Sequence, residues 1–274
     1  MSSVIAIYRD VRFSPNSVAA DRSIMDATID RLSQHQVLAI AEHELGEQHR
    51  ADLFLSMGRL PRTIQLLRAR EQQDRALVIN NAAALERFSR RHILQMMQEN
   101  GIPTPPETGE HGYWVKRADS AAQTKADVVF CSDKATVEQI KRNFALRGVD
   151  DVVVSAHVVG DLIKFYGVGD SFFWYFYPTD NGHSKFGNEK RNGIAQHFGF
   201  NLSELRVVAM RLARLTGIDV YGGDCIVDCE GRFSIIDFND WPSFSPCHEQ
   251  AADAISLFVN RLLAAQNNSQ QKNG

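Results

Sequence analysis

The sequence lacks several common signatures of nucleotide binding and of hydrolytic catalysis. It contains no Gly-x-x-x-x-Gly-Lys-Ser/Thr phosphate loop, and no Gly-x-Gly-x-x-Gly segment follows a predicted strand. It also has no His-Glu-x-x-His pair and no Gly-x-Ser-x-Gly turn. These absences disfavour a P-loop nucleotidase and a dinucleotide-binding Rossmann domain, and they give no support to a zinc protease or an α/β-hydrolase.

An excess of charge of one sign is also absent. The 274 residues include 30 Lys and Arg against 33 Asp and Glu, a net charge of −3, so the bulk electrostatics favour neither a nucleic acid nor a membrane surface as partner. No apolar run approaches the roughly 18 residues that span a bilayer, and the N-terminus lacks the basic segment of a signal peptide. We therefore expect a cytoplasmic protein without a membrane or nucleic-acid partner. The four cysteines match no zinc-knuckle spacing and are expected to be reduced.

The first 82 residues alternate between apolar runs and helical patterns. Apolar runs typical of strands occur at 4–8, 37–40, 51–55 and 76–79, and helical periodicity occurs between them, as at 60–70. This alternation predicts an α/β N-terminal domain with a parallel sheet, residues 1–82. Ligands gather at the carboxyl ends of such strands, and Arg9, Arg12 and Arg59 lie there.

Residues 83–178 are predicted to form a second unit of α+β structure. A helix is expected at 83–100, and the stiff, proline-rich segment 102–106 follows it. Strand patterns occur at 113–117, 128–131, 152–154, 162–168 and 172–177, with a helix at 135–147. We expect the last three strands to be successive antiparallel neighbours.

Residues 179–264 are predicted to form a third unit. It begins with a cationic loop at 179–199, which includes Lys185 and Arg191, and continues with a helix at 202–215. An acidic hairpin at 223–239 and a closing helix at 251–264 complete it. The remaining residues, 265–274, are nearly all polar and are expected to be a disordered tail.

The acidic hairpin carries the strongest chemical signal. If Glu230 and Gly231 form a two-residue turn, Ile226 faces Ile235 and Asp224 faces Asp237. Asn239 then shares a face with Asp237. Like charges directly opposite one another are destabilising unless a cation lies between them, and two carboxylates with an amide oxygen suit Mg²⁺, with Mn²⁺ as an alternative. The competing interpretation is an exposed hairpin whose acids are solvated.

Cationic residues elsewhere suggest what the cation would accompany. Lys116 ends a predicted strand, Lys164 lies among apolar residues of another, and Arg191 lies in the cationic loop. A nucleoside triphosphate with Mg²⁺ would satisfy these cations and the acids together, since phosphoryl transfer depends on positioning and charge neutralisation. Taken singly, each cation could instead be a solvated surface residue, and His157 could be a structural histidine rather than a ligand contact.

Several segments then match one family in order. Ile236-Asp237-Phe238-Asn239-Asp240-Trp241-Pro242 looks like an acid-x-Asn ending followed by Pro, with Asp224 upstream; 154–169 looks like an adenine-holding hinge; and 100–105, Asn-Gly-Ile-Pro-Thr-Pro, looks like the segment after a first ATP-site helix. In this the chain resembles the ATP-grasp superfamily over roughly residues 80–263. The resemblance is nearest to the ribosomal-protein glutamate ligase branch, with some features of inositol-phosphate kinases.

The resemblance implies two α+β subdomains of ATP-grasp type and an ATP site between them. Mg²⁺ ions would lie on Asp224, Asp237 and Asn239, and Arg191 would meet the transferred phosphate. Lys116 matches the second phosphate lysine, and Arg90 replaces the first. The hinge has Ser155, Ala156, His157 and Val158 where relatives carry a glutamate, so adenine would depend on backbone groups. The loop at 117–122 lacks the glycines that wrap a phosphate.

The function implied is that of an ATP-dependent carboxylate–amine ligase acting through an acylphosphate on small-molecule or peptide substrates. Lys164 and Arg191 would act on the transferred group, and Arg9, Arg12 and Arg59 on an anionic end of the acceptor. Two alternatives stay open, a small-molecule kinase on the same scaffold and a nucleotide-binding protein without catalysis. The sequence leaves the substrates and the oligomeric state open.

Overall fold

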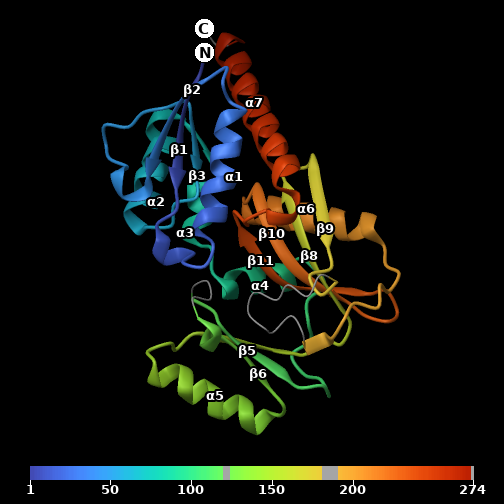
Figure 1. Ribbon diagram of the computed structural model, residues 1–274. Helices are drawn as coiled ribbons and strands as arrows, with labels where there is room; N and C mark the ends of the chain where they lie inside the picture. The colour runs from blue at the N-terminus through green and yellow to red at the C-terminus, as the bar shows by residue number, and fades with distance from the viewer. Residues whose placement is uncertain (120–123, 181–190, 273–274) are drawn as a thin grey trace.

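The computed structural model describes residues 1–119, 124–180 and 191–272 (Figure 1). The strands are β1 (Ser3–Tyr8), β2 (Gln36–Ala41), β3 (Leu53–Ser56), β4 (Leu77–Ile79), β5 (Tyr113–Arg117), β6 (Val128–Cys131), β7 (Val152–Ala156), β8 (Asp161–Val168), β9 (Phe172–Phe176), β10 (Val220–Val227) and β11 (Phe233–Asp240). The α-helices are α1 (Val18–Asp30), α2 (Pro61–Ala69), α3 (Ala82–Glu86), α4 (Arg90–Glu99), α5 (Lys134–Leu146), α6 (Leu202–Thr216) and α7 (His248–Lys272). Part of the glycine-poor loop at 117–122 and of the cationic loop, including Lys185, lies outside the described residues.

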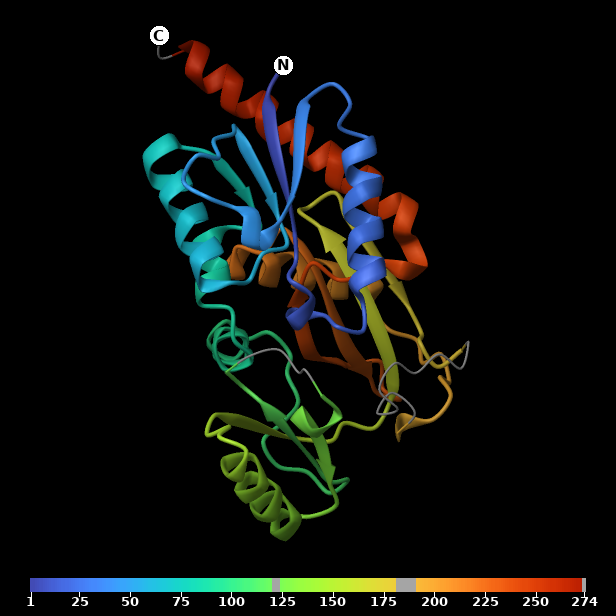
Figure 2. The same cartoon turned by 60° about the vertical axis from the view of Figure 1, so that its left-hand side comes forward.

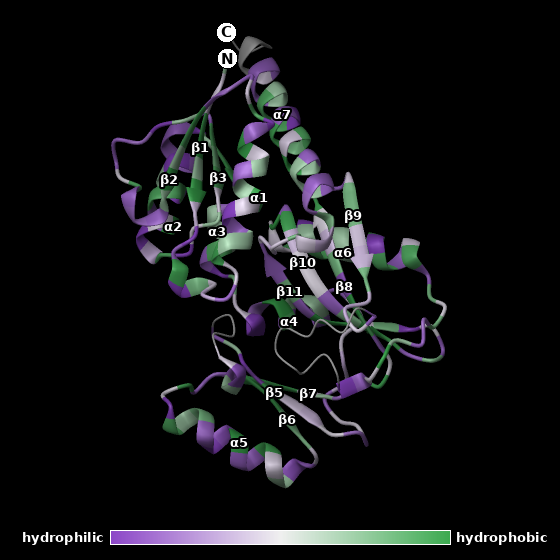
Figure 3. Cartoon of the chain, viewed as in Figure 1, coloured by the Kyte–Doolittle hydropathy of each residue, from purple (hydrophilic) through white to green (hydrophobic). Residues whose placement is uncertain are grey.

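The N-terminal sheet is parallel, as predicted, with strand order β2-β1-β3-β4. Both of its faces are buried, which suits the nearly continuous apolar runs of its strands. Val4 and Ala6 pack with residues of α1 and α7, whereas Ile5 and Ile7 pack on the opposite side with residues of α2. Figures 1 and 2 show α7 running beside α1, and Figure 3 shows hydrophobic residues along the strands of this sheet.

The second sheet, β6-β5-β7, is small and antiparallel, and α5 covers one of its faces. Tyr113 and Val115 point toward α5, where they pack with Val137 and Phe144. Trp114 and Lys116 alternate with them and therefore point to the opposite face. That face is turned toward the third sheet.

The third sheet, β11-β10-β8-β9, is antiparallel throughout. One face is covered by α6 and α4, through a core that includes Phe165, Tyr221 and Leu212. On the other face, Val168 and Val220 pack into the same core as α7 and the N-terminal sheet. One face of β1 and one face of α7 thereby share a continuous core with the third sheet.

The strand grouping differs from the expectation at β7 and β8. β7 pairs with β5, whereas β8 and β9 pair with each other and with β10, so the three strands are not successive neighbours in one unit. The predicted boundary at residue 178 therefore falls after strands that already belong to the third sheet. Gly160, at φ 155°, lies against the backbone of Val227, where a Cβ would meet the Val227 oxygen at 2.2 Å, and this close approach starts β8 beside β10.

Two helices were predicted with the wrong extent. The segment 83–100 is two helices, because the Ser89 side chain accepts a hydrogen bond from the His92 amide and starts α4 afresh. The C-terminal segment expected to be disordered instead continues α7 to Lys272. It contains no Gly or Pro before Gly274, and Gln266 donates to the Arg75 carbonyl at 2.9 Å.

The acidic hairpin pairs Asp224 with Asp237, as predicted, but by a different route. Asp228 accepts hydrogen bonds from the Glu230 and Arg232 amides, so the connection is longer than a two-residue turn and Ile226 faces Ser234 rather than Ile235. A bulge at Ile236 inserts one residue and restores the register beyond it.

None of the helices in the described ranges is both long and apolar enough to cross a membrane.

Candidate functional site

A cleft of about 940 Å³ lies between the uncovered faces of the second and third sheets and extends to the N-terminal domain. Its size is at the upper end of the range for ligand sites, about 300–1,000 Å³. Side chains on one face of a strand recur every second residue, so the third sheet presents its residues to the cleft in rows. Three such rows follow one another along β8, β10 and β11.

The first row is apolar. Leu162 of β8 and Ile226 of β10 are register partners, and both line the cleft. From the facing sheet, Trp114 lines the same cavity. This end of the cleft can therefore hold a flat apolar group between a tryptophan and two aliphatic side chains.

The second row is charged. Asp224 is the register partner of both Lys164 on β8 and Asp237 on β11. Lys164 Nζ lies 3.2 Å from Asp224 Oδ1, and Arg90 Nη2 lies 3.4 Å from Asp237 Oδ2. Asn239 follows two residues after Asp237 on the same strand and lines the same cavity. Asp224, Asp237 and Asn239 therefore lie on adjacent strands and line the same cleft, and their role as metal ligands stays a prediction.

The donor set suits a hard divalent cation. Two carboxylates and one amide carbonyl are oxygen ligands, which Mg²⁺ prefers, and the cleft leaves space for its remaining ligands. No group of three or more His, Cys, Asp or Glu side chains arranged to hold a metal occurs within residues 1–119, 124–180 and 191–272. Any metal in this row would therefore depend on Asn239 or on a ligand's oxygens.

Lys116 links the two sheets across the cleft. Its Nζ donates to the carbonyl of Ile236, the bulge residue, at 2.9 Å. Arg90 makes a second link, since its Nη1 donates to the Arg117 carbonyl at 2.6 Å while its Nη2 reaches Asp237. The Arg90 Nε is buried and has no partner among the described residues.

The electrostatics of this row favour an anionic ligand. Burial, opposed by Asp237 and reinforced by Arg90, lowers the pKa of Lys116 to about 8. Burial also raises the pKa of Asp237, but Arg90 and Lys116 outweigh it and hold that pKa below its usual value. Among the residues that the structure describes, two carboxylates face three cations, Arg90, Lys116 and Lys164, so these residues carry a positive excess before Arg191 is counted.

The third row is aromatic and polar. Gly222 is the register partner of Tyr166 on β8 and of Asn239 on β11. A Cβ on Gly222 would meet Tyr166 and Pro242, each at 2.9 Å, so these two side chains close over the glycine. Tyr166 also stacks on Phe176, with ring centroids 6.0 Å apart. The row thus forms a tightly packed aromatic floor.

The predicted hinge residues line the cleft, but the protein itself uses several of their backbone groups. Ser155, Ala156, His157 and Val158 all line the cavity. The Ala156 amide donates to the Pro106 carbonyl and the His157 amide to the Gly112 carbonyl, both at 2.8 Å. The Val158 carbonyl accepts from Asn192 at 3.2 Å. The backbone groups that could still hydrogen-bond to a base are therefore those of 155–158 that have no partner within the protein.

His157 belongs to an aromatic cluster behind the hinge. The Trp114 indole N–H donates to His157 Nδ1 at 3.1 Å, and because the indole can only donate, this nitrogen carries no proton. Burial and the nearby Arg191 lower the pKa of His157, which agrees with a neutral ring. Arg191 lies over the Phe130 ring, 3.5 Å from its centroid, and lines the cleft. The cluster therefore positions both Trp114 and Arg191.

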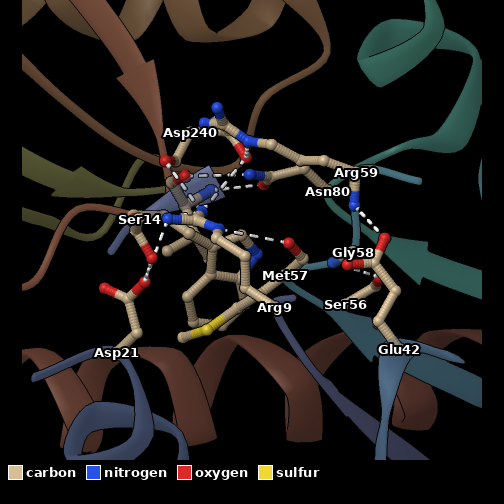
Figure 4. Close-up of polar contacts among 12 residues, drawn as sticks. Arg9, Ser14, Asp21, Glu42, Ser56, Met57, Gly58, Arg59, Asn80 and Asp240 are labelled. Atoms are coloured by element: carbon tan, nitrogen blue, oxygen red, sulfur yellow. Dashed lines mark hydrogen bonds and ion pairs between the residues drawn. The ribbon is translucent and has the colours of Figure 1, made fainter. Parts of the chain in front are cut away.

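The three arginines predicted for an anionic acceptor differ in their surroundings, and Figure 4 shows two of them, Arg9 and Arg59. Arg12 does not line the cleft; its side chain is 65% exposed and pairs with Asp10. Arg9 and Arg59 line it, but both are engaged by Asp240. Their charges are thus already matched within the protein.

The sequence analysis did not identify the first and third rows of the third sheet, nor the side chains of the second sheet that face them. Period-two alternation from Lys164 leads directly to Leu162 and Tyr166, so the signal for them was present in β8. Gly222 gave a weaker signal, as a glycine within a strand that marks close approach. Asn192 and the bulge at Ile236 had no local signal.

Comparisons with known proteins bear on the fold. No protein-family model matches the chain, and no curated protein sequence is significantly similar to it. Among solved structures, a D-alanine–D-alanine ligase from Bacillus anthracis complexed with ATP is similar with a TM-score of 0.67 and 12% identity, covering 100% of both chains. A RimK-domain ATP-grasp protein from Sphaerobacter thermophilus DSM 20745 is similar with a TM-score of 0.62 and 15% identity, covering 93% of this chain and 99% of the other.

The chain therefore has the ATP-grasp fold, as its sequence motifs indicated. At 10–15% identity these likenesses establish the architecture, and what the cleft does must be argued from its residues.

Proposed function

We propose that this protein is an ATP- and Mg²⁺-dependent carboxylate–amine ligase. The observation that carries the proposal is the order of the rows on the third sheet, apolar, then charged, then aromatic, within one cleft. That order corresponds to a base, its phosphates with a cation, and an acceptor. The solved ligases of the same fold support it as analogy.

The nucleotide would occupy the first two rows. Leu162, Ile226 and Trp114 would enclose the base, and the free backbone groups of the hinge would hydrogen-bond to it. Arg90 and Lys116 would bind the phosphates. A nucleoside triphosphate with one Mg²⁺ carries about two net negative charges. The positive excess of the charged row, together with Arg191, matches that charge.

The chemistry would take place at the boundary between the second and third rows. The substrate carboxylate attacks the γ-phosphorus and ADP leaves, which gives an acylphosphate; an amine then attacks the acyl carbon and phosphate leaves. Lys164 and Arg191 would stabilise charge on the transferred group, which is the main contribution a protein makes to phosphoryl transfer. A divalent cation on Asp224, Asp237 and Asn239 would neutralise the phosphates.

The test measures ADP release with mixtures of carboxylates and amines, together with product analysis. Asp237→Asn should reduce turnover at least about 100-fold, whereas Asp170→Asn, a surface change outside the cleft, should not. An Asp237→Asn protein as active as the parent would overturn the assignment. A stable phosphoester formed without an amine would identify a kinase instead, and binding of Mg-ATP without any turnover would identify a nucleotide-binding protein.

A further inference from the structure

The end of the cleft nearest the N-terminal domain shows what kind of acceptor the site can take. Beyond the charged row, five residues with large apolar surfaces line the cavity, Phe13, Tyr166, Phe176, Pro242 and Pro246, and the serines Ser14, Ser17, Ser243 and Ser245 line it as well. We call this set the acceptor compartment. Tyr166 stacks on Phe176 and lies 5.3 Å from Phe244, centroid to centroid, so one wall of the compartment is packed aromatic surface.

The charged side chains beside this compartment are already paired with other groups of the protein (Figure 4). Arg9 Nη1 lies 3.2 Å from Asp21 Oδ2, and its Nη2 donates to the carbonyls of Asp240 and Trp241 at 3.5 and 3.4 Å. Its Nε donates to the Met57 carbonyl at 3.3 Å. All three guanidinium nitrogens thus already have protein acceptors, and the side chain is only 7% exposed.

Arg59 is similarly engaged. Its guanidinium pairs with the Asp240 carboxylate, which is itself buried. Behind it, the buried Glu42 carboxylate accepts the backbone amides of Arg59 and Leu60. The cluster therefore places three carboxylates, Asp21, Asp240 and Glu42, against two guanidinium groups, an excess of one negative charge.

An anionic group on the far end of an acceptor would meet this negative excess, and no unpaired cation among the described residues of this compartment would receive it. An anion in a cavity of low dielectric is destabilised strongly when it is unpaired. An aromatic or branched apolar group would instead replace water on the walls of the compartment. The charge balance and the apolar part of the lining therefore both favour an uncharged aromatic or branched apolar group at the far end of the acceptor.

Resting on the proposed function, we propose that the carboxylate substrate is a monocarboxylate with an aromatic or bulky apolar body. Its carboxylate lies at the charged row and its body lies in the acceptor compartment. A second, remote carboxylate is disfavoured. The specificity comes from Tyr166 and Phe176, which contact the body, and from Asp21 and Asp240, which repel a distant anion through the cluster.

The experiment compares two ligands that differ only at the remote end, 3-phenylpropionate and 3-(4-carboxyphenyl)propionate. With Mg-ATP and hydroxylamine as the amine, hydroxamate formation should have a kcat/KM at least about tenfold higher for the monoanion. Calorimetry with the full chain and a non-hydrolysable ATP analogue should show the same preference in Kd. Equal or tighter binding of the dianion, or binding of neither ligand, overturns the proposal.

The calorimetric measurement distinguishes a failure of this inference from a failure of the proposed function. If neither compound turns over but the monoanion binds preferentially beside the analogue, the ligase assignment fails and the compartment's preference stands. If a dianion such as glutarate turns over best, the ligase assignment stands and the present inference fails.

A variant that changes charge without changing shape tests whether the negative excess of the cluster causes the preference for the monoanion. Asp21→Asn keeps the shape of the cluster and removes its excess negative charge, so the ratio of the two Kd values should shrink several-fold toward unity. Asp30→Asn, an exposed carboxyl at the end of the same helix, should leave the ratio unchanged. An unchanged ratio in Asp21→Asn would show that the charge cluster does not set the preference.

Discussion

Two groups of acidic and basic side chains lie in or beside the cleft: the charged row, and a cluster at the N-terminal end made of Arg9, Arg59, Asp21, Glu42 and Asp240, which we call the arginine cluster. The two groups differ in the exposed fraction of their carboxylates and in their net charge. In the row, Asp224 and Asp237 are 27% and 26% exposed, and their cations outnumber them. In the cluster, Asp240 is 1% exposed, and acids outnumber the guanidinium groups. Partly exposed pairs with a positive excess can exchange partners with a ligand, whereas pairs that share a buried carboxylate hold the structure together.

The cluster joins two parts of the chain that are distant in sequence. Arg9 and Arg59 follow β1 and β3 of the parallel sheet, and Asp240 ends β11. Beside them, the buried Asn80 side chain accepts from the Val220 amide at 2.7 Å and donates to the Val220 carbonyl at 2.9 Å. Asp240 directly follows Asn239, so the cluster also fixes the end of the strand that carries the charged row.

The largest expected effect breaks the cluster. Asp240→Ala leaves the Arg9 and Arg59 guanidinium groups, whose side chains are 7% and 18% exposed, without their shared buried carboxylate. The free energy of unfolding should fall by about 3–5 kcal/mol. Asp224→Ala, in the charged row, should change it by no more than about 1 kcal/mol, because the row is partly solvated. Urea unfolding of both variants measures the contrast. Equal losses of stability would mean that the two regions do not differ in the way their exposure indicates.

The second effect concerns binding rather than stability. Lys116→Met removes a cation that faces the charged row, and the affinity for a non-hydrolysable ATP analogue with Mg²⁺ should fall at least about 100-fold. The stability should not fall, since burial already penalises the charged ammonium. Calorimetry checks the affinity, with Lys141→Met on the outer surface of α5 as the control. An unaltered Kd would remove Lys116 from the site.

The pH dependence sharpens the same assignment. Because the pKa of Lys116 is lowered to about 8, the ammonium is charged below that pH and loses its charge above it. The affinity for the nucleotide analogue should therefore weaken by about fivefold between pH 8 and pH 9. Lys116→Arg, whose side chain stays charged, should show a nearly flat profile over this range. A parent profile as flat as that of Lys116→Arg would show that Lys116 is not the titrating group.

The same shift affects stability with the opposite sign. Between about pH 8 and the unfolded value of 10.5, the native state binds fewer protons at Lys116 than the unfolded state does. This residue therefore makes the folded state more stable as the pH rises through that window. Comparing the parent with Lys116→Met in urea at pH 8 and pH 10 isolates the contribution.

The charged row could be predicted from the sequence because its signals are local. The facing of Asp224 and Asp237 follows from a hairpin and a period of two, and the ATP-grasp motifs lie within short segments. The saturation of Arg9 and Arg59 could not be predicted, because their partner Asp240 lies 231 and 181 residues away along the chain. The division of β7 and β8 between two sheets likewise depends on long-range pairing, with β5 and β10, that leaves no local pattern.

The smallest expected effect tests whether the geometry of Arg90 matters separately from stability. Ser89 caps α4 by accepting from the His92 amide at 3.2 Å, and Asn201 caps α6 by accepting from the Glu204 amide at 3.1 Å. Replacing either residue by Ala should lower the free energy of unfolding by about 1 kcal/mol. Only Ser89→Ala releases the first turn of the helix that carries Arg90 beside Asp237, so only it should also weaken the binding of the nucleotide analogue, by a few-fold. If both variants weaken binding equally, the loss follows stability alone, and the position of Arg90 does not depend on its cap.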